Sequence, residues 1–286
     1  MPWRPDFPNA HRWFWAEVCV RVLLVSFFVV TEDLEPFNRV IQPEEQWLYK
    51  FPRTSAYITT TALYCITIPA SILVVLVVFA IKRNYQDAWA GLLVPSLALP
   101  LTGLFTNIIK LSVGRPRPDF FDRCYPGVKN FNASLPCTGD PHDVMEGKKS
   151  FPSGHSSNAF CSFIFVSLYL AGQLGVFNGR GRGQGWRVLL CMVPVVLAIL
   201  MAISRTDDYH HHWQDVTVGA IIGTLLAYIS YRQYFPCLSS ESSDLPYMSL
   251  GSRYQYESDF DNPYSKQPYR RSMMSQSALG NPVKLI

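Results

Sequence analysis

The chain has 286 residues, of which 49% are hydrophobic and only 16% are charged, well below the quarter usual for soluble proteins. Its net charge of +4 is small and its basic residues are scattered, which leaves no argument for nucleic acid as a partner. Seven cysteines occur without Cys-x-x-Cys or Cys/His spacing, so no zinc site is predicted. The composition indicates a membrane protein.

Apolar stretches near the length of a membrane-spanning helix recur along the chain. They occupy residues 13–31, 56–81, 88–109, 156–177, 188–203 and 216–235. The first contains Glu17 and Arg21, which are four residues apart and can pair on a helix. These charges, and the lack of a small-residue cleavage site, favour an uncleaved span over a signal peptide. The predicted fold is all-α, a bundle of six transmembrane helices.

Loop charges predict the orientation of this bundle. Six spans place both termini on the side of the short loops 82–87 and 178–187, which carry lysine and arginine. The positive-inside rule makes that side cytoplasmic. The long loop 110–155 then faces the lumen or the cell exterior, although its own basic residues weaken the argument unless several of them serve chemistry.

Two features of the long loop agree with an outer or lumenal location. The sequon Asn132-Ala133-Ser134 is a candidate glycosylation site. Cys124 and Cys137 can form a disulfide in an oxidising compartment or remain free thiols.

The chain divides into three regions. Residues 1–12 are a cytoplasmic N-terminus, and residues 13–235 form the six-span domain. Residues 236–286 are rich in Ser, Tyr, Gln and Asn, which predicts a disordered cytoplasmic tail.

The first polar cluster, KLSVGRPRP at residues 110–118, follows the third apolar stretch. Lys110 stands where a lysine commonly anchors a helix at the interface. The prolines after Arg115 and Arg117 end the helix and turn both guanidinium groups into one loop. Cations concentrated in this way favour an anion, and guanidinium groups match phosphate oxygens.

The second cluster, FPSGH at residues 151–155, precedes the fourth apolar stretch. Ser153 and Gly154 are typical of an ordinary helix start. That interpretation does not explain His155, which falls in the first helical turn, where free backbone N–H groups favour an anion. An anion held there would meet a proton donor.

The third cluster, SRTDDYHHHWQD at residues 204–215, connects the last two apolar stretches. Arg205 adds a cation. His211 and Asp215 are four apart, so on a helix the carboxylate can hold the Nδ1 proton of the imidazole and leave Nε2 free. Adjacent histidines also raise the alternative of a metal site, but neighbouring side chains diverge, and the nearby cations could neutralise a phosphate without metal.

Together the clusters resemble the signature of the type 2 phosphatidic acid phosphatase superfamily, the lipid phosphate phosphatases. That signature is Lys-x6-Arg-Pro, Pro-Ser-Gly-His and Ser-Arg-x5-His-x3-Asp, and the chain fills every specified position in order, within about residues 13–235. The segments VGRPRPDFFDRC, CTGD, KSFPSGHSS and HHWQDV are most similar to the phospholipid phosphatase 4 and 5 branch, the diacylglycerol pyrophosphate phosphatase-like proteins.

The resemblance implies a membrane hydrolase of phosphomonoesters such as phosphatidate, lysophosphatidate or diacylglycerol pyrophosphate that needs no Mg²⁺ or other cofactor. It implies that His211 attacks phosphorus to form a phosphohistidine, that Asp215 orients His211, and that His155 protonates the leaving alkoxide. The residues implied to bind the phosphate are Lys110, Arg117, Ser153, Gly154 and Arg205.

Two alternatives from other functional classes remain. Cations near a membrane boundary also line anion or lipid transporters, but such a protein has no need of the paired histidines, and no inverted repeat is evident. The other alternative is a catalytically silent lipid-binding protein. The expected partners are a lipid phosphate and membrane lipids, in the endoplasmic reticulum or the plasma membrane, and homo-oligomerisation is left open.

Overall fold

The structure of the protein is a computed structural model that describes residues 10–128 and 136–250. Within these ranges every regular element is a helix and no strand occurs. The predicted all-α class is therefore confirmed. The candidate glycosylation site Asn132 lies outside the described residues.

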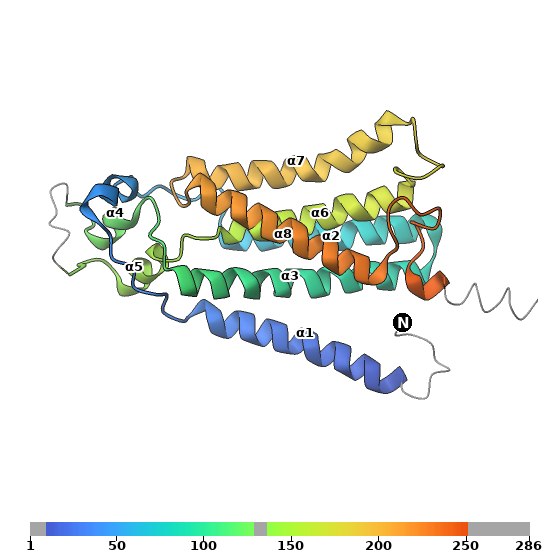
Figure 1. The fold of residues 1–286 in the computed structure, drawn as a ribbon, viewed down its shortest axis with the longest axis horizontal. Coiled ribbons are helices and arrows are strands. Elements are labelled where there is room, and N and C mark those ends of the chain that lie inside the picture. The colour runs from blue at the N-terminus through green and yellow to red at the C-terminus, as the bar shows by residue number, and fades with distance from the viewer. Residues whose placement is uncertain (1–9, 129–135, 251–286) are drawn as a thin grey trace, which may run out of the picture.

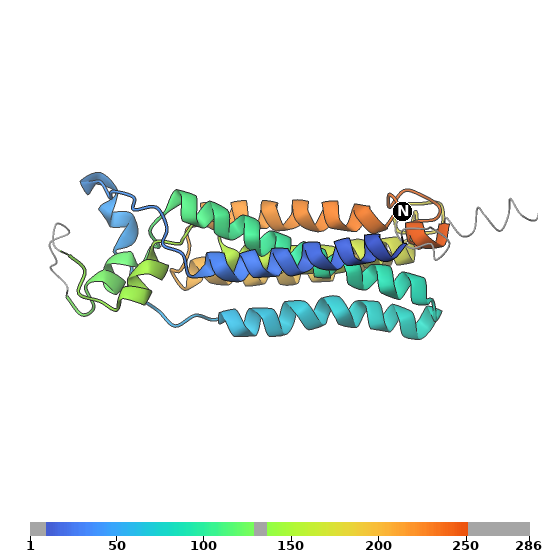
Figure 2. The same cartoon turned by 90° about the horizontal axis from the view of Figure 1, so that it is seen from below.

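In the described part of the chain, long helices run side by side and short helices gather at one end of the bundle (Figures 1 and 2). The long helices are α1 (Ala10–Glu32), α2 (Thr60–Lys82), α3 (Tyr85–Val113), α6 (Gly154–Leu174), α7 (Gly185–Asp207) and α8 (Trp213–Tyr234). The short helices are η1 (Pro43–Tyr49), α4 (Phe120–Cys124) and α5 (Pro141–Gly147). The start of α1 and the end of α8 lie at the opposite end (Figure 1).

Five described helices are long and apolar enough to cross a membrane. They are Phe14–Glu32, Thr60–Lys82, Tyr85–Val113, Gly154–Leu174 and Gly185–Asp207. Helix α8 is outside this set despite its 22 residues, because polar residues interrupt its apolar sequence. It nevertheless packs along α6 and also contacts α3 and α7. A sixth span therefore depends on α8.

Glycines allow α8 to approach α6 closely. A Cβ atom on Gly219 would lie 2.6 Å from the carbonyl oxygen of Ser153, and one on Gly223 would overlap the carbonyl oxygen of Ser157. Small residues at such contacts let helix backbones approach and pack inside membranes. The same contact brings the start of α8 beside the start of α6, where two of the polar clusters lie.

We expect Gly223→Ala to destabilise the bundle, because the added methyl group would overlap backbone atoms of α6 that cannot move independently. Overpacking of this kind typically lowers the free energy of unfolding by about 1–3 kcal/mol. The thermal unfolding midpoint in detergent measures the effect. Gly185→Ala is the matched control, since a Cβ there meets no atom within 4 Å. Equal midpoints for the two variants would contradict the close contact.

The ends of α3 and α6 are set by residues next to the polar clusters. Helix α3 ends at Val113 and is capped by Gly114, whose φ of 56° lies in the left-handed region and whose N–H donates to the carbonyl of Lys110. A side chain at this glycine would also overlap the carbonyl oxygen of Phe37. Helix α6 begins after Ser153, whose hydroxyl accepts a hydrogen bond from the N–H of Ser156.

The predicted pair of charges in the first stretch is present and joins α1 to its neighbours. Arg21 contacts the Glu17 carboxylate and donates to the Tyr234 hydroxyl at 2.6 Å and to the Ser96 hydroxyl at 3.1 Å. These partners lie on α8 and α3, so the partly buried guanidinium links three helices.

Residues 236–250 pack against the helices at the end of the bundle opposite the short helices (Figure 1). The hydroxyl of Ser243 donates to the carbonyl of Gly172 at 3.1 Å, and Asp244 pairs with Arg180 at 2.7 Å. This differs from the expectation of a disordered tail beginning at residue 236, because these serine and acidic side chains find partners on α6 and in the loop after it. Residues 251–286 lie outside the described part.

Candidate active site

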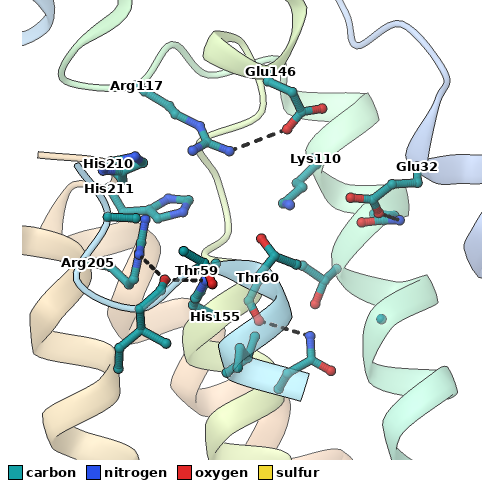
Figure 3. Close-up of a pocket in the computed structure, with 18 of the residues that line it drawn as sticks. Glu32, Thr59, Thr60, Lys110, Arg117, Glu146, His155, Arg205, His210 and His211 are labelled. Carbon is teal, nitrogen blue, oxygen red and sulfur yellow. Dashed lines mark hydrogen bonds and ion pairs between the residues drawn. The ribbon is translucent and has the colours of Figure 1, made fainter. Parts of the chain in front are cut away.

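The three polar clusters meet at the end of the bundle that carries the short helices (Figure 1). Lys110 comes from the end of α3, His155 from the first turn of α6, Arg205 from the last turn of α7, and His211 from the loop before α8. They line one cavity of about 330 Å³ (Figure 3). The fold therefore brings residues of the three clusters, which are far apart in the sequence, into one cavity.

Six of the eight predicted site residues line this cavity, namely Lys110, Arg117, Gly154, His155, Arg205 and His211. The other two, Ser153 and Asp215, are fully buried and are not part of the cavity wall. Ser153 acts as the N-cap of α6, which is the ordinary role that its sequence context also allowed. Asp215 lies next to the histidines of the third cluster, on the side away from the cavity.

Two arginines of the cavity have N–H groups without a hydrogen-bond acceptor in the described part of the chain. Arg205 is 1% exposed, and in the described part of the chain the Nε atoms of Arg205 and Arg117 are buried without a hydrogen-bond acceptor. Burial and the neighbouring charge of Arg123 lower the pKa of Arg117. Unpaired donors and desolvated positive charge are both relieved by an anion, and a phosphate offers several acceptor oxygens.

The N-terminus of α6 faces the same space. Gly154 occupies the first helical position, where backbone N–H groups are not used within the helix and favour an anion. A Cβ on Gly154 would lie 3.3 Å from Nζ of Lys110, so the ammonium group lies directly against this turn. The glycine thus lets a lysine and a helix N-terminus share one anion site.

We expect Gly154→Ala to lower kcat/KM for a phosphomonoester by about 10-fold, because displacement of a positioned charge by a fraction of an ångström weakens transition-state contacts. Helix propensity favours alanine here, so folding should be preserved. Steady-state kinetics together with the thermal midpoint separate the two effects. Unchanged kinetics would show that the lysine does not work from this position.

His211 is held in one tautomer by the backbone. Its Nδ1 lies 2.8 Å from the carbonyl oxygen of Ser150. A carbonyl only accepts hydrogen bonds, so Nδ1 carries the proton and Nε2 carries the lone pair. Burial first, then the charges of Arg117 and Arg205, lower the pKa of His211 well below its usual value of 6.5. The ring is therefore neutral and its Nε2 is available as a nucleophile.

We expect the ¹⁵N NMR signals of His211 to show the neutral Nδ1–H tautomer at pH 6.5, where an ordinary histidine is half protonated. Selective ¹⁵N-histidine labelling in detergent, with His211→Asn for assignment, measures this. The unfolded chain would take up this proton below pH 6.5 whereas the native state does not, so stability is lost as the pH falls below 6.5. A half-protonated His211 ring at pH 6.5 would contradict the placement.

Asp215 contacts His211 less directly than its spacing suggests. Its Oδ2 lies 3.9 Å from Nδ1 of His211, beyond hydrogen-bond distance, because the Ser150 carbonyl occupies that nitrogen. Both carboxylate oxygens are taken by other donors. Oδ1 accepts from Arg115 at 2.6 Å, and Oδ2 accepts from the Ser150 hydroxyl at 2.6 Å and lies 3.2 Å from Nδ1 of His212.

His155 and Arg205 meet at one backbone carbonyl. Nε2 of His155 lies 3.1 Å from the carbonyl oxygen of Ile58, which also accepts from Nη1 of Arg205 at 2.8 Å. The loop before α2 therefore fixes the His155 ring against the cavity (Figure 3). Arg205 is further held by Asp208, at 2.9 Å.

Acidic residues also face the cavity, and the sequence motifs do not include them. Glu146 of α5 lies 3.5 Å from Arg117 (Figure 3). It also lies 2.9 Å from Lys149. Burial raises the pKa of Glu146, but its basic neighbours together outweigh burial, so the pKa lies below its usual value. Glu32, at the end of α1, lies on the other side of the cavity and accepts from Asn107 at 2.7 Å. The charges of the loops did not indicate which carboxylates would line the cavity.

In residues 10–128 and 136–250, no group of three or more His, Cys, Asp or Glu side chains has a geometry that could hold a metal ion. In the short-helix region, Cys124 and Cys137 are joined by a disulfide.

Comparison with known proteins identifies the family. The sequence pattern of the PAP2 superfamily matches residues 89–238, more than half of the chain. The chain belongs to the PAP2 superfamily. The resemblance drawn from the three motifs is thereby confirmed, since the matched region contains all of them.

Other PAP2 superfamily members are similar along most of their length. The chain is 37% identical to Lipid phosphate phosphatase 2 of Arabidopsis thaliana, over 80% of this chain and 78% of that protein. It is 30% identical to Diacylglycerol pyrophosphate phosphatase 1 of Saccharomyces cerevisiae, over 82% and 83%. It is 31% identical to Phospholipid phosphatase 1 of Rattus norvegicus, over 73% and 80%. No solved structure matches the chain.

Proposed function

We propose that this protein is an integral membrane phosphatase that hydrolyses phosphomonoesters of lipids through a phosphohistidine at His211. One observation carries the proposal. A neutral histidine with a free Nε2 lone pair borders a cavity whose desolvated cations have unused donors. Such a site binds a phosphoryl group and presents a nucleophile to it, and phosphoryl transfer depends largely on positioning and charge stabilisation.

In the first step, Nε2 of His211 forms a bond to phosphorus while the bond from phosphorus to the lipid oxygen breaks. His155 donates a proton to the departing alkoxide. In the second step, His155 takes a proton from water, the water oxygen bonds to phosphorus, and the bond to His211 breaks, which releases inorganic phosphate. Lys110, Arg117 and Arg205 compensate the negative charge of the phosphoryl oxygens throughout, so no Mg²⁺ is needed.

The lipid class is supported by the relatives and by the cavity wall. The relatives are named lipid phosphate, diacylglycerol pyrophosphate and phospholipid phosphatases. Apolar side chains of α1 and α2, including Phe28 and Leu63, line the cavity beside its polar groups. We infer substrates such as phosphatidate, lysophosphatidate and diacylglycerol pyrophosphate, with the phosphate among the cations and the acyl chains towards the helices.

We further propose six spans, with α8 as the sixth, cytoplasmic termini and an active site facing the lumen or the cell exterior, in the endoplasmic reticulum or plasma membrane. The basic short loops, the common end for α1 and α8, and the disulfide on the opposite side support this orientation. A glycosidase-sensitive mass shift that disappears in Asn132→Gln would place loop 110–155 on the lumenal side. Glycosylation of an acceptor site engineered into the tail would reverse the orientation.

The activity is tested with purified protein in mixed micelles containing phosphatidate and excess EDTA. The wild type should release inorganic phosphate and His211→Ala should not. No release by the wild type across phosphatidate, lysophosphatidate and diacylglycerol pyrophosphate would overturn the proposal and favour a silent lipid-binding protein. Release that requires added Mg²⁺ would overturn the metal-independent step.

A further inference from the structure

Ser150, the residue just before the FPSGH segment, uses every polar group it has at the active site. Its side chain is fully buried. Its N–H donates to the carbonyl of Arg115 at 2.9 Å, its carbonyl accepts from Nδ1 of His211 at 2.8 Å, and its hydroxyl donates to Oδ2 of Asp215 at 2.6 Å. One serine thus joins the nucleophile, the carboxylate behind it and the loop after α3.

Arg115 holds the same carboxylate from the other side. Its Nη1 donates to Oδ1 of Asp215 at 2.6 Å, and the Asp215 side chain is 0% exposed. A buried carboxylate requires both charge compensation and hydrogen bonds. Arg115 supplies the opposite charge, whereas His211 is neutral and 3.9 Å away. The carboxylate is therefore fixed without a direct bond to the nucleophile.

We propose that Ser150 and Arg115 are positioning residues, and that Asp215 acts on His211 through Ser150. This rests on the proposed function of His211 as the nucleophile. Asp215, held by Arg115, anchors the Ser150 hydroxyl, and the anchored serine aims its carbonyl at Nδ1 of His211. The carbonyl keeps the proton on Nδ1 and the lone pair on Nε2. Rotation of this peptide would free the ring to take the other tautomer, which has no lone pair on the attacking nitrogen.

A purely structural role for Ser150 makes a different prediction. A serine that only fills space would change the amount of folded protein or the thermal midpoint when replaced, and would leave the histidine tautomer as it is. A positioning serine changes kcat at constant KM and shifts the tautomer. Groups that orient metal-ligating histidines typically contribute about 10–100-fold to activity, and we expect the same range for a serine that orients His211.

The test is a double-mutant cycle of Ser150→Ala and Asp215→Asn, measured as kcat and KM for phosphatidate in mixed micelles. Each single variant should lower kcat about 10–100-fold with little change in KM. The double variant should be no slower than Asp215→Asn alone, because both changes interrupt one connection. Multiplied losses in the double variant, or full activity of Ser150→Ala, would overturn the proposal.

Two further variants keep the test decisive. Ser150→Thr retains the hydroxyl and should recover most of the lost kcat. Arg115→Gln with Asp215→Asn provides a second cycle with the same expected outcome if Ser150→Ala does not fold. The ¹⁵N spectrum of His211 should show part of the Nε2–H tautomer in Ser150→Ala, and an unchanged spectrum would contradict positioning. An inactive wild type would refute the proposed function itself, whereas an active wild type with multiplied losses refutes only this inference.

Discussion

His211→Asn should reduce phosphate release from phosphatidate to background, a loss of about 10⁴–10⁶-fold in kcat, because the variant lacks the Nε2 atom that bonds to phosphorus. Asparagine matches the shape of the ring near Nδ1 and can still donate to the Ser150 carbonyl, so the fold should be retained. Phosphate release in micelles and the thermal midpoint are the two measurements.

The control for this loss is His210→Asn. His210 also lines the cavity, but its Nδ1 lies 2.8 Å from the carbonyl oxygen of Asp208, within its own loop. Removing it should lower kcat by less than about 10-fold, in line with the loss of one hydrogen bond. If His210→Asn were as inactive as His211→Asn, the assignment of the nucleophile to His211 would be wrong.

His155→Asn should lower kcat for phosphatidate by about 10²–10⁴-fold, the usual contribution of general acid–base catalysis. The reason is that an alkoxide is a poor leaving group without a proton. The size of the loss should depend on the leaving group. With p-nitrophenyl phosphate, whose phenolate leaves without protonation, the first step should proceed and only hydrolysis of the phosphohistidine should remain slow.

Rapid-mixing kinetics distinguish these steps. His155→Asn should release a burst of p-nitrophenolate that approaches one equivalent per enzyme, followed by slow turnover. The wild type should show a smaller burst, because His155 activates the water of the second step. Equal losses for phosphatidate and p-nitrophenyl phosphate, without a burst, would mean that His155 binds phosphate rather than transferring protons.

The motifs predicted one shared site, and six of the eight predicted residues line one cavity, because helix ends are fixed by local chemistry. Gly114 ends α3 after Lys110, and Ser153 starts α6 before His155. Once the helices pack as a bundle, these ends come together at one side of it. The cations and both histidines are therefore where the clusters placed them.

The indirect connection from Asp215 to His211 could not be predicted from the motif spacing. The spacing of four residues predicts a shared helical face, but His211 precedes α8, which begins at Trp213. The partner of its Nδ1 is a backbone carbonyl of Ser150, whose direction depends on how the 110–155 loop folds. Every residue has a backbone carbonyl, so the sequence does not indicate that the carbonyl of Ser150 contacts His211 or that Arg115 contacts Asp215. Only the structure shows these contacts.

The packing of α8 also could not be predicted from the sequence. Residues 216–235 look like a span, but α8 is less apolar than the other long helices, with Asp215 in its first turn and Arg232 in its last turn. Its close contact at Gly219 and Gly223 depends on which face meets a neighbour. Likewise, the partners that order residues 236–250 lie far away in the sequence, so composition alone predicts only a polar tail.

The central claim is that phosphate passes through His211, and trapping the phosphoenzyme tests it most directly. His155→Asn mixed with p-nitrophenyl [³²P]phosphate should be quenched in alkali, where phosphohistidine survives, and the labelled peptide identified by mass spectrometry. We expect one labelled site, His211, and no label in the His155→Asn/His211→Asn double variant. Label on another residue, or an active wild type with no phosphoenzyme under any quench, would contradict the account.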